Sequence, residues 1–96
     1  MPKYAVILEG RNFPIITDKG VRMLGFYVTR KVKAENEQEA VMIAMEHVRT
    51  DPELLTVVDR NKASNPKLFV KSTETLGWYG DTKSTGYTFF PMKANQ

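Results

Sequence analysis

Cysteine is absent from this chain of 96 residues, and histidine and tryptophan each occur only once. Without cysteine there is no disulfide framework and no thiolate chemistry, so a reducing cytoplasm is the expected location. No apolar run reaches the roughly 18 residues that a membrane-spanning helix requires. The first residues, Met-Pro-Lys-Tyr, lack the charged and then apolar layout of a signal peptide. The sequence therefore predicts a cytoplasmic protein without a membrane partner.

Residues that usually carry catalysis or bind metals are sparse. A general base needs a partner and a pocket, and His47 alone forms no metal-ligand pattern. The acidic residues near it are spread around a predicted helix and do not converge on one site; they are Glu35, Glu37, Glu39 and Glu46. We therefore predict a protein that is not an enzyme, with no catalytic residue, no metal site and no cofactor.

The composition is that of one globular domain. Hydrophobic residues make up 42% of the chain and charged residues 26%, which is ordinary for a folded protein. A chain of this length can bury one modest core. We expect a single domain over residues 1–96, with residues 92–96 frayed at the end.

The net charge of +3 hides a segregation along the chain. Residues 34–59 carry seven acidic residues and one arginine, whereas residues 1–33 carry seven lysines and arginines and two acidic residues. Residues 60–96 are again basic, with six lysines and arginines and two acidic residues. Two interpretations stay open. Lysines can guard strand edges against aggregation, or the basic segments can meet an anionic partner or the acidic side of another copy.

Residues 36–50 are predicted to form the one long helix. Asn36 is a good N-cap, and Glu39, three residues later, can complete a capping box. Pro52 disfavours helical geometry at Asp51, so the helix should end near Thr50. Asp51 can then cap a short new turn that has Pro52 at its first position.

The predicted helix has one clear apolar stripe. At about 100° per residue, the stripe that should pack on a sheet is formed by Ala40, Val41, Ala44, Met45 and Val48. Met42 and Ile43 lie outside this stripe. One exposed apolar residue means little, but the pair is also consistent with a second contact, for instance with a partner subunit.

Two strands are predicted before the helix. Residues 3–9 are apolar at both parities, which favours a strand that is central in a sheet or lies at an interface. Gly10 should end it, and Pro14 argues against a central strand within the loop expected over residues 11–20. Residues 23–34 alternate with a period of two, and their apolar face is formed by Leu24, Phe26, Val28, Val32 and Ala34.

Arg30 interrupts the apolar face of this second strand. One interpretation is a bulge or bend near Arg30, since the strand is longer than the usual 5–6 residues, or an arginine at the end of the sheet with its guanidinium in water. The other is a cation directed at a ligand, or at a carboxylate across an interface.

The end of the chain is rich in aromatic residues. A polar loop over residues 59–66 leads to a strand predicted over residues 67–76. Two aromatic arms around a glycine-flanked polar loop then favour a hairpin. The aromatic residues either stabilise this hairpin by cross-strand pairing or form a docking surface, in which case the partner-binding residues are Trp78, Tyr79, Tyr87 and Phe89.

These elements predict an α+β fold. We expect a two-layer sandwich, in which an antiparallel sheet of three to five strands carries one long helix packed on one face. The other face must then meet water or another subunit. Apolar residues at both parities of residues 4–8 favour a homodimer.

Two functions fit these features. The first is a small, non-enzymatic, self-associating module that binds a protein partner through the aromatic hairpin or the open sheet face. The alternative is a protein that binds RNA or single-stranded DNA through a basic strand face, because cations beside an exposed aromatic residue can follow phosphates and stack bases. The candidate residues for the alternative are Arg22, Tyr27, Arg30, Lys31 and Lys33.

Overall fold

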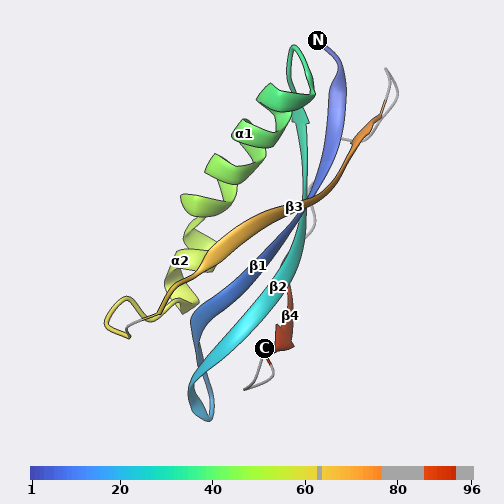
Figure 1. The fold of residues 1–96 in the computed structure, drawn as a ribbon. Coiled ribbons are helices and arrows are strands. Elements are labelled where there is room, and N and C mark those ends of the chain that lie inside the picture. The colour runs from blue at the N-terminus through green and yellow to red at the C-terminus, as the bar shows by residue number, and fades with distance from the viewer. Residues whose placement is uncertain (63, 77–85, 93–96) are drawn as a thin grey trace.

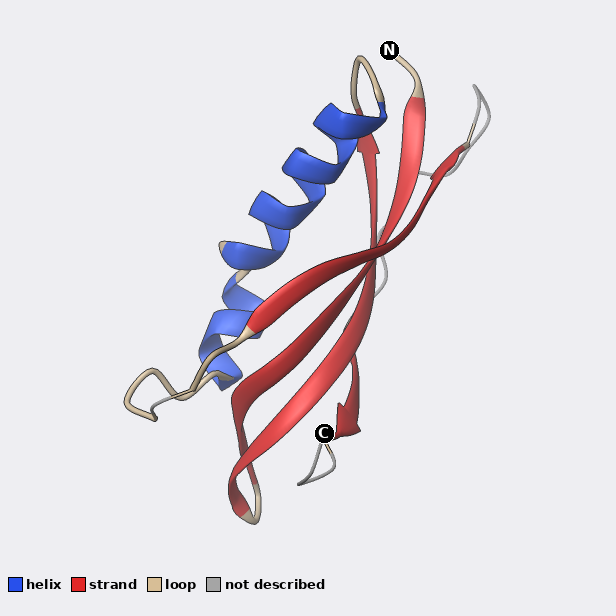
Figure 2. Cartoon of the chain, viewed as in Figure 1, coloured by secondary structure: helices blue, strands red, loops and turns tan. Residues whose placement is uncertain are grey.

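A four-stranded antiparallel sheet carries two helices on one face in the computed structural model (Figure 1). The structure describes residues 1–62, 64–76 and 86–92. The elements in chain order are β1 (Lys3–Thr17), β2 (Gly20–Lys33), α1 (Glu37–Arg49), α2 (Pro52–Val57), β3 (Lys67–Thr75) and β4 (Thr88–Pro91). Within the sheet, the four strands follow the order β3-β1-β2-β4. The predicted two-layer α+β sandwich is confirmed (Figure 2).

The helices begin and end where local signals place them. The Asn36 side chain accepts a hydrogen bond from the Glu39 amide at 2.8 Å, and the Asp51 side chain accepts one from the Glu53 amide at 3.0 Å. Both contacts satisfy first-turn amides that have no partner within the helix. Along the stripe of α1, Ala40, Ala44 and Val48 are buried, as the apolar spacing predicts.

β1 lies between β3 and β2, so the central position predicted for this strand is confirmed. The predicted end at Gly10 is wrong, because β1 continues to Thr17 through a bulge between Gly10 and Phe13. Pro14 is tolerated there because β3 pairs with β1 only as far as Arg11. The carbonyl of Pro14 instead accepts a hydrogen bond from the Asp59 amide at 2.8 Å.

The core lies between β1, β2 and the helices. Its largest fully buried side chains are Phe26, Leu8, Val6, Val28 and Val48. Gly10 is required opposite Phe26, because a Cβ at Gly10 would lie 2.2 Å from the Phe26 ring. The missing side chain of one strand therefore makes the space for the largest core side chain of the next.

Arg30 stays in regular register with β1, opposite Val6. The bulge or bend predicted near Arg30 is therefore wrong, and the irregularity of this strand pair lies in β1 instead. Directly opposite residues share a face of the sheet, so Arg30 lies on the same face as the core residue Val6. We call this side, covered by α1 and α2, the helix face, and the other side the open face.

β3 and β4 are the two edges of the sheet. β4 pairs with residues 24–27 of β2. The first arm of the predicted aromatic hairpin, with Trp78 and Tyr79, lies outside the described residues, as do residues 93–96 of the predicted frayed end. Across residues 1–62, 64–76 and 86–92, no helix has the length and apolarity needed to cross a membrane.

Candidate interaction surfaces

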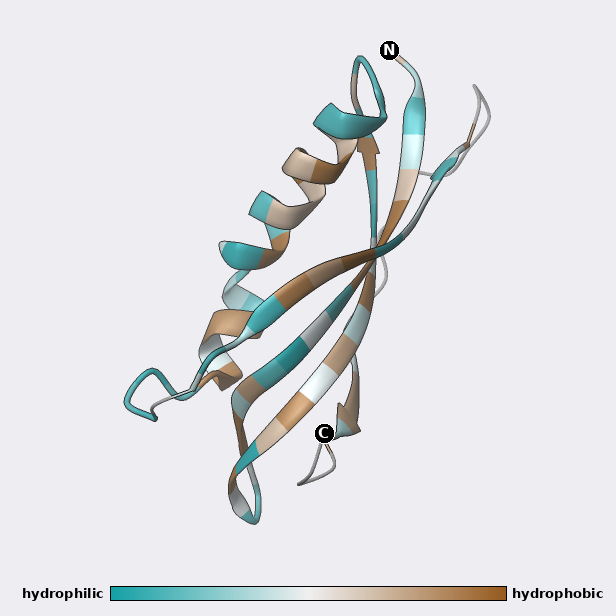
Figure 3. Ribbon diagram, viewed as in Figure 1, coloured by the Kyte–Doolittle hydropathy of each residue, from teal (hydrophilic) through white to brown (hydrophobic). Residues whose placement is uncertain are grey.

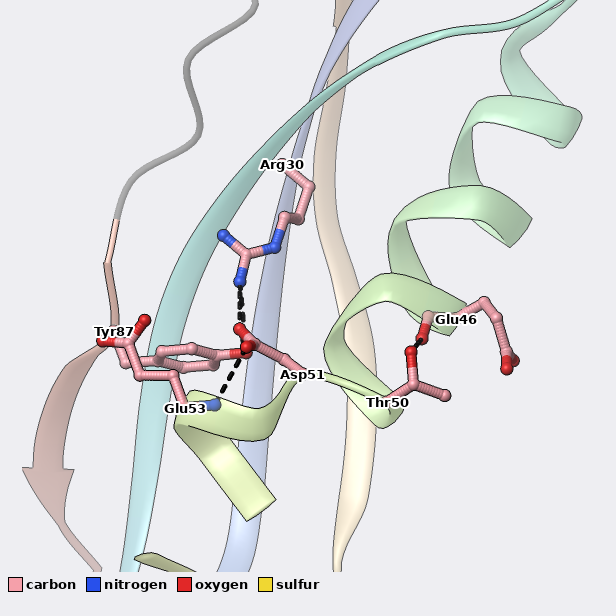
Figure 4. Close-up of polar contacts among 6 residues, drawn as sticks. All are labelled: Arg30, Glu46, Thr50, Asp51, Glu53 and Tyr87. Atoms are coloured by element: carbon pink, nitrogen blue, oxygen red, sulfur yellow. Dashed lines mark hydrogen bonds and ion pairs between the residues drawn. The ribbon is translucent and has the colours of Figure 1, made fainter. Parts of the chain in front are cut away.

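Three polar side chains from distant parts of the chain meet beside α2 (Figure 4). Arg30 Nη2 lies 2.6 Å from Asp51 Oδ2, and the Tyr87 hydroxyl donates a hydrogen bond to the same oxygen at 2.7 Å. The Arg30 guanidinium carbon also lies 5.4 Å from the centre of the Tyr87 ring. The side chains of Arg30 and Asp51 are only 11% and 18% exposed. We call these three residues the Arg30 cluster.

The Arg30 cluster changes the acid–base properties of two of its members. Burial by itself raises the pKa of Asp51, but hydrogen bonds from Tyr87 and Glu53 and the charge of Arg30 outweigh it and lower that pKa. Burial, together with the hydrogen bond to Asp51, raises the pKa of Tyr87 far above its usual value. The Asp51 carboxylate and the Tyr87 hydroxyl thus serve as hydrogen-bond partners for each other. The cluster connects β2 to the helix junction, where Asp51 lies between α1 and α2, and to Tyr87, the residue before β4.

This geometry decides between the two interpretations of Arg30. The cation is directed at a carboxylate, but that carboxylate is Asp51 of the same chain. An arginine on the apolar face of a strand was the signal for such a partner. Its identity lay 21 residues further along the chain, beyond the reach of any local pattern.

The residues predicted to bind nucleic acid are divided between the two faces. Tyr27, Lys31 and Lys33 lie on the open face, because they alternate with the core residues of β2. Arg22 and Arg30 share the parity of those core residues and lie on the helix face. The structure therefore brings together three of the five candidates.

The open face gathers further cations that sequence reasoning did not select. The register of the sheet adds Lys3 and Arg11 from β1 and Lys67 and Lys71 from β3 to this face. Only the pairing of strands could reveal this group, since its first and last members, Lys3 and Lys71, are 68 residues apart in the chain.

Glu9 lies among these cations and is only 4% exposed. Its carboxylate is 2.6 Å from Arg11 Nε and 3.8 Å from Lys71 Nζ. The Arg11 guanidinium carbon in turn lies 5.8 Å from the centre of the Phe69 ring. Glu9 thereby neutralises part of the positive charge in the middle of the open face and orders the side chains around it.

The predicted partner-binding aromatics occupy different environments. Trp78 and Tyr79 lie outside the described residues. Tyr87 is half-buried, with its ring 5.2 Å from that of Phe26 and its hydroxyl on Asp51. Phe89 is exposed and stacks on Tyr87 at 6.1 Å. Of this candidate set, Phe89 is the described residue that is accessible to a partner.

A third surface follows the outer edge of β3, which we call the β3 flank. Leu68, Phe69 and Val70 form an apolar run within β3 (Figure 3), and Phe69 and Val70 are 44% and 40% exposed. Met42 of α1 is 72% exposed. It lines an open groove of about 430 Å³ between α1 and β3, together with Glu37, Gln38, Val41 and Thr73.

Comparison of the chain with protein-family models, with curated proteins and with solved structures finds no match. Within the described part of the chain, no three histidine, cysteine or acidic residues are grouped so that they could hold a metal ion. The features of the described residues that bear on function are therefore the three surfaces: the Arg30 cluster, the open face and the β3 flank.

Proposed function

We propose that this chain is a small, non-enzymatic, cytoplasmic module that associates with itself and acts through binding. The observation that carries the proposal is the β3 flank. There β3, an edge strand of nine residues, carries exposed apolar side chains and lies beside the exposed Met42 of α1. An edge strand presents backbone donors and acceptors that another strand can satisfy, while apolar contacts add affinity.

The Arg30 cluster supports a binding function more than a catalytic one. It contains two groups, Asp51 and Tyr87, whose pKa values clearly depart from their usual values. Both shifts favour the protonation states that these groups already have at neutral pH. A general acid or base would need a pKa near the working pH, and this pair moves away from it.

Light scattering on a sizing column tests self-association directly. We expect a mass of about twice the 11.0 kDa of one chain, and we expect it to persist at high salt because apolar burial contributes to the contact. A mass of one chain at every concentration up to the millimolar range would contradict the proposal.

The second candidate function is binding of RNA or single-stranded DNA on the open face. The observation that favours it is the gathering of Lys33, Arg11, Lys67 and Lys71 on the face that carries the exposed ring of Tyr27. Phosphate contacts of this kind make affinity fall steeply with salt concentration.

Fluorescence titration with single-stranded oligonucleotides tests this second candidate. The variant Lys33→Glu should weaken binding, whereas Lys19→Glu, in the turn between β1 and β2, changes charge equally at a distant position. Binding that is absent, or that is insensitive to salt and to Lys33→Glu, would rule it out. Salt thus separates the two functions, because it should dissociate an oligonucleotide and leave the self-associated form intact.

A further inference from the structure

We infer that β3 of one copy pairs antiparallel with β3 of a second copy across a two-fold axis between Val70 and Lys71, giving one continuous sheet. This inference rests on the proposed self-association. It adds the strand that pairs, the register, and the side chains that meet. The occupant of the β3 flank is therefore a second copy of this chain.

β3 offers the most complete edge for such pairing. It has nine residues, contains no proline, and lies at the edge of the sheet. Among the described residues, none pairs with its outer side. The opposite edge is less suitable, because β4 has four residues and ends in Pro91, which cannot donate to a ladder.

The register follows from a bulge in β3. Val70 lies opposite Leu8 and Ser72 lies opposite Ile7, so Lys71 is an extra residue in the pairing with β1. Because of this extra residue, the alternation of faces is shifted after Val70. Lys67 and Phe69 lie on the open face together with Ser72 and Glu74, although their numbers differ in parity.

Directly opposite residues in an antiparallel pair must lie on the same face. Away from the bulge, an axis between Val70 and Lys71 meets this condition, since it sets Lys67 opposite Glu74 and Phe69 opposite Ser72. At the axis itself, Val70 of each copy lies opposite the bulge residue Lys71 of the other, and there the two faces do not match. An axis through Lys71 does not, because it would set Phe69, on the open face, opposite Thr73, on the helix face. The bulge therefore excludes every register that is displaced by one residue.

Charge selects among the remaining registers. Lys67 and Glu74 are exposed and, within the described residues, have no ion-pair partner in their own chain. The proposed axis sets them opposite each other twice, once on each side of the two-fold. A shift by two residues in one direction sets Phe69 opposite Glu74, and a shift in the other sets Lys67 opposite Ser72. Both lose the charge pairs.

The same register also covers the exposed side of α1. Leu68 of the second copy would lie opposite Thr73, which lines the groove with Val41 and Met42. Leu68 of the second copy, which is half-buried, would thus approach Met42, the most exposed large apolar side chain of α1. The register thereby gives the exposed side chain of Met42 an apolar neighbour.

Charge reversal tests the register. In Lys67→Glu or Glu74→Lys, like charges face each other twice per dimer, so we expect the dimer dissociation constant to rise about tenfold. The double variant Lys67→Glu/Glu74→Lys restores opposite charges and should return within about twofold of the original value. Lys19→Glu is the matched control and should leave the constant unchanged. Sedimentation equilibrium measures the dimer dissociation constant of these four variants, and circular dichroism verifies that each is folded.

Because the chain has no cysteine, a disulfide can report the register directly. The variant carrying both Phe69→Cys and Ser72→Cys should oxidise to a covalent dimer on a non-reducing gel, since opposite residues approach closely enough for a disulfide. The single variant Phe69→Cys should remain uncrosslinked, because residue 69 of one copy does not lie opposite residue 69 of the other in this register.

The outcomes separate this inference from the function on which it rests. A wild-type protein that is monomeric throughout would overturn both. A dimer whose dissociation constant ignores the single charge reversals, or is not restored by the double variant, would overturn the β3 register and leave self-association through another surface.

Discussion

Asp51 has two tasks that are usually given to different residues. One of its oxygens accepts the first-turn amide of α2, and the other accepts from Arg30 and Tyr87. A partly buried carboxylate is costly unless its lone pairs are occupied, and here both oxygens are. The Arg30 cluster is therefore the contact that joins β2, the helix junction and the C-terminal strand.

Removing one hydroxyl from this cluster should be measurable. We expect Tyr87→Phe to lower the free energy of unfolding by about 1.5–3 kcal/mol, the usual worth of a hydrogen bond to a charged group. Urea denaturation gives the value. Tyr27→Phe, which removes the hydroxyl of an exposed ring, is the control and should change stability by less than about 0.5 kcal/mol. Equal effects of the two variants would mean that the hydroxyl of Tyr87 contributes nothing specific.

The cluster also predicts how stability depends on pH. The pKa of Asp51 is lower in the folded protein than its unfolded value of 3.8. The folded state therefore binds fewer protons, and the stabilisation is fully present above the unfolded pKa and is lost as pH falls through the folded one. We expect the stability difference between the wild type and Asp51→Asn to shrink as pH falls from 6 to below about 3. A difference that is constant over this range would contradict the assignment.

Glycines set the close contacts of the strands at the scale of elements. Gly10 lies under the ring of Phe26 on the helix face. On the open face, Gly25 lies opposite Phe90, and a Cβ at Gly25 would come 2.3 Å from that ring. On each face of the sheet, an aromatic ring thus lies over a glycine of the neighbouring strand. This arrangement covers backbone that a glycine would otherwise leave exposed.

Adding a single methyl group tests this arrangement. We expect Gly10→Ala to destabilise the protein by about 1–3 kcal/mol, because the fully buried ring of Phe26 must shift against its neighbours to make room for the methyl group. Gly86→Ala is the matched control, since a Cβ there meets no atom of the described residues within 4 Å. Thermal or urea denaturation compares the two, and a neutral Gly10→Ala would show that the core is less tightly packed than the structure indicates.

Charge is segregated between layers at the scale of the whole molecule. The acidic segment 34–59 forms the helical layer, while lysines and arginines of three strands lie on the open face. The β3 flank, where Lys67 and Glu74 lie on one strand, carries both signs. A surface of mixed charge can meet a copy of itself without repulsion. That property favours the flank over the predominantly basic middle of the open face as the place where two copies meet.

Self-association also predicts that stability depends on protein concentration. Binding between folded copies stabilises the folded state by mass action. We therefore expect the urea midpoint to rise between micromolar and hundred-micromolar protein, and to rise much less for Lys67→Glu. Midpoints that coincide at all concentrations would indicate a protein that unfolds as a monomer.

The sequence by itself determined the features that depend on close neighbours in the chain. Asn36, Asp51 and Pro52 set the helix ends, because capping acts within three or four residues. The alternation of residues 23–34 predicted β2 and its apolar face, because the period of two is a property of the strand alone. The two-layer fold followed from these elements.

Only the tertiary structure decided which distant residues meet. The continuation of β1 past Gly10 depends on where β3 stops pairing, the partner of Arg30 lies across the helix junction, and the faces of β3 depend on one extra residue opposite β1. None of these has a local signature, because strand register and burial are set by contacts between segments that are far apart in sequence. The β3 flank became visible for the same reason: it exists only where α1 and the edge of the sheet come together.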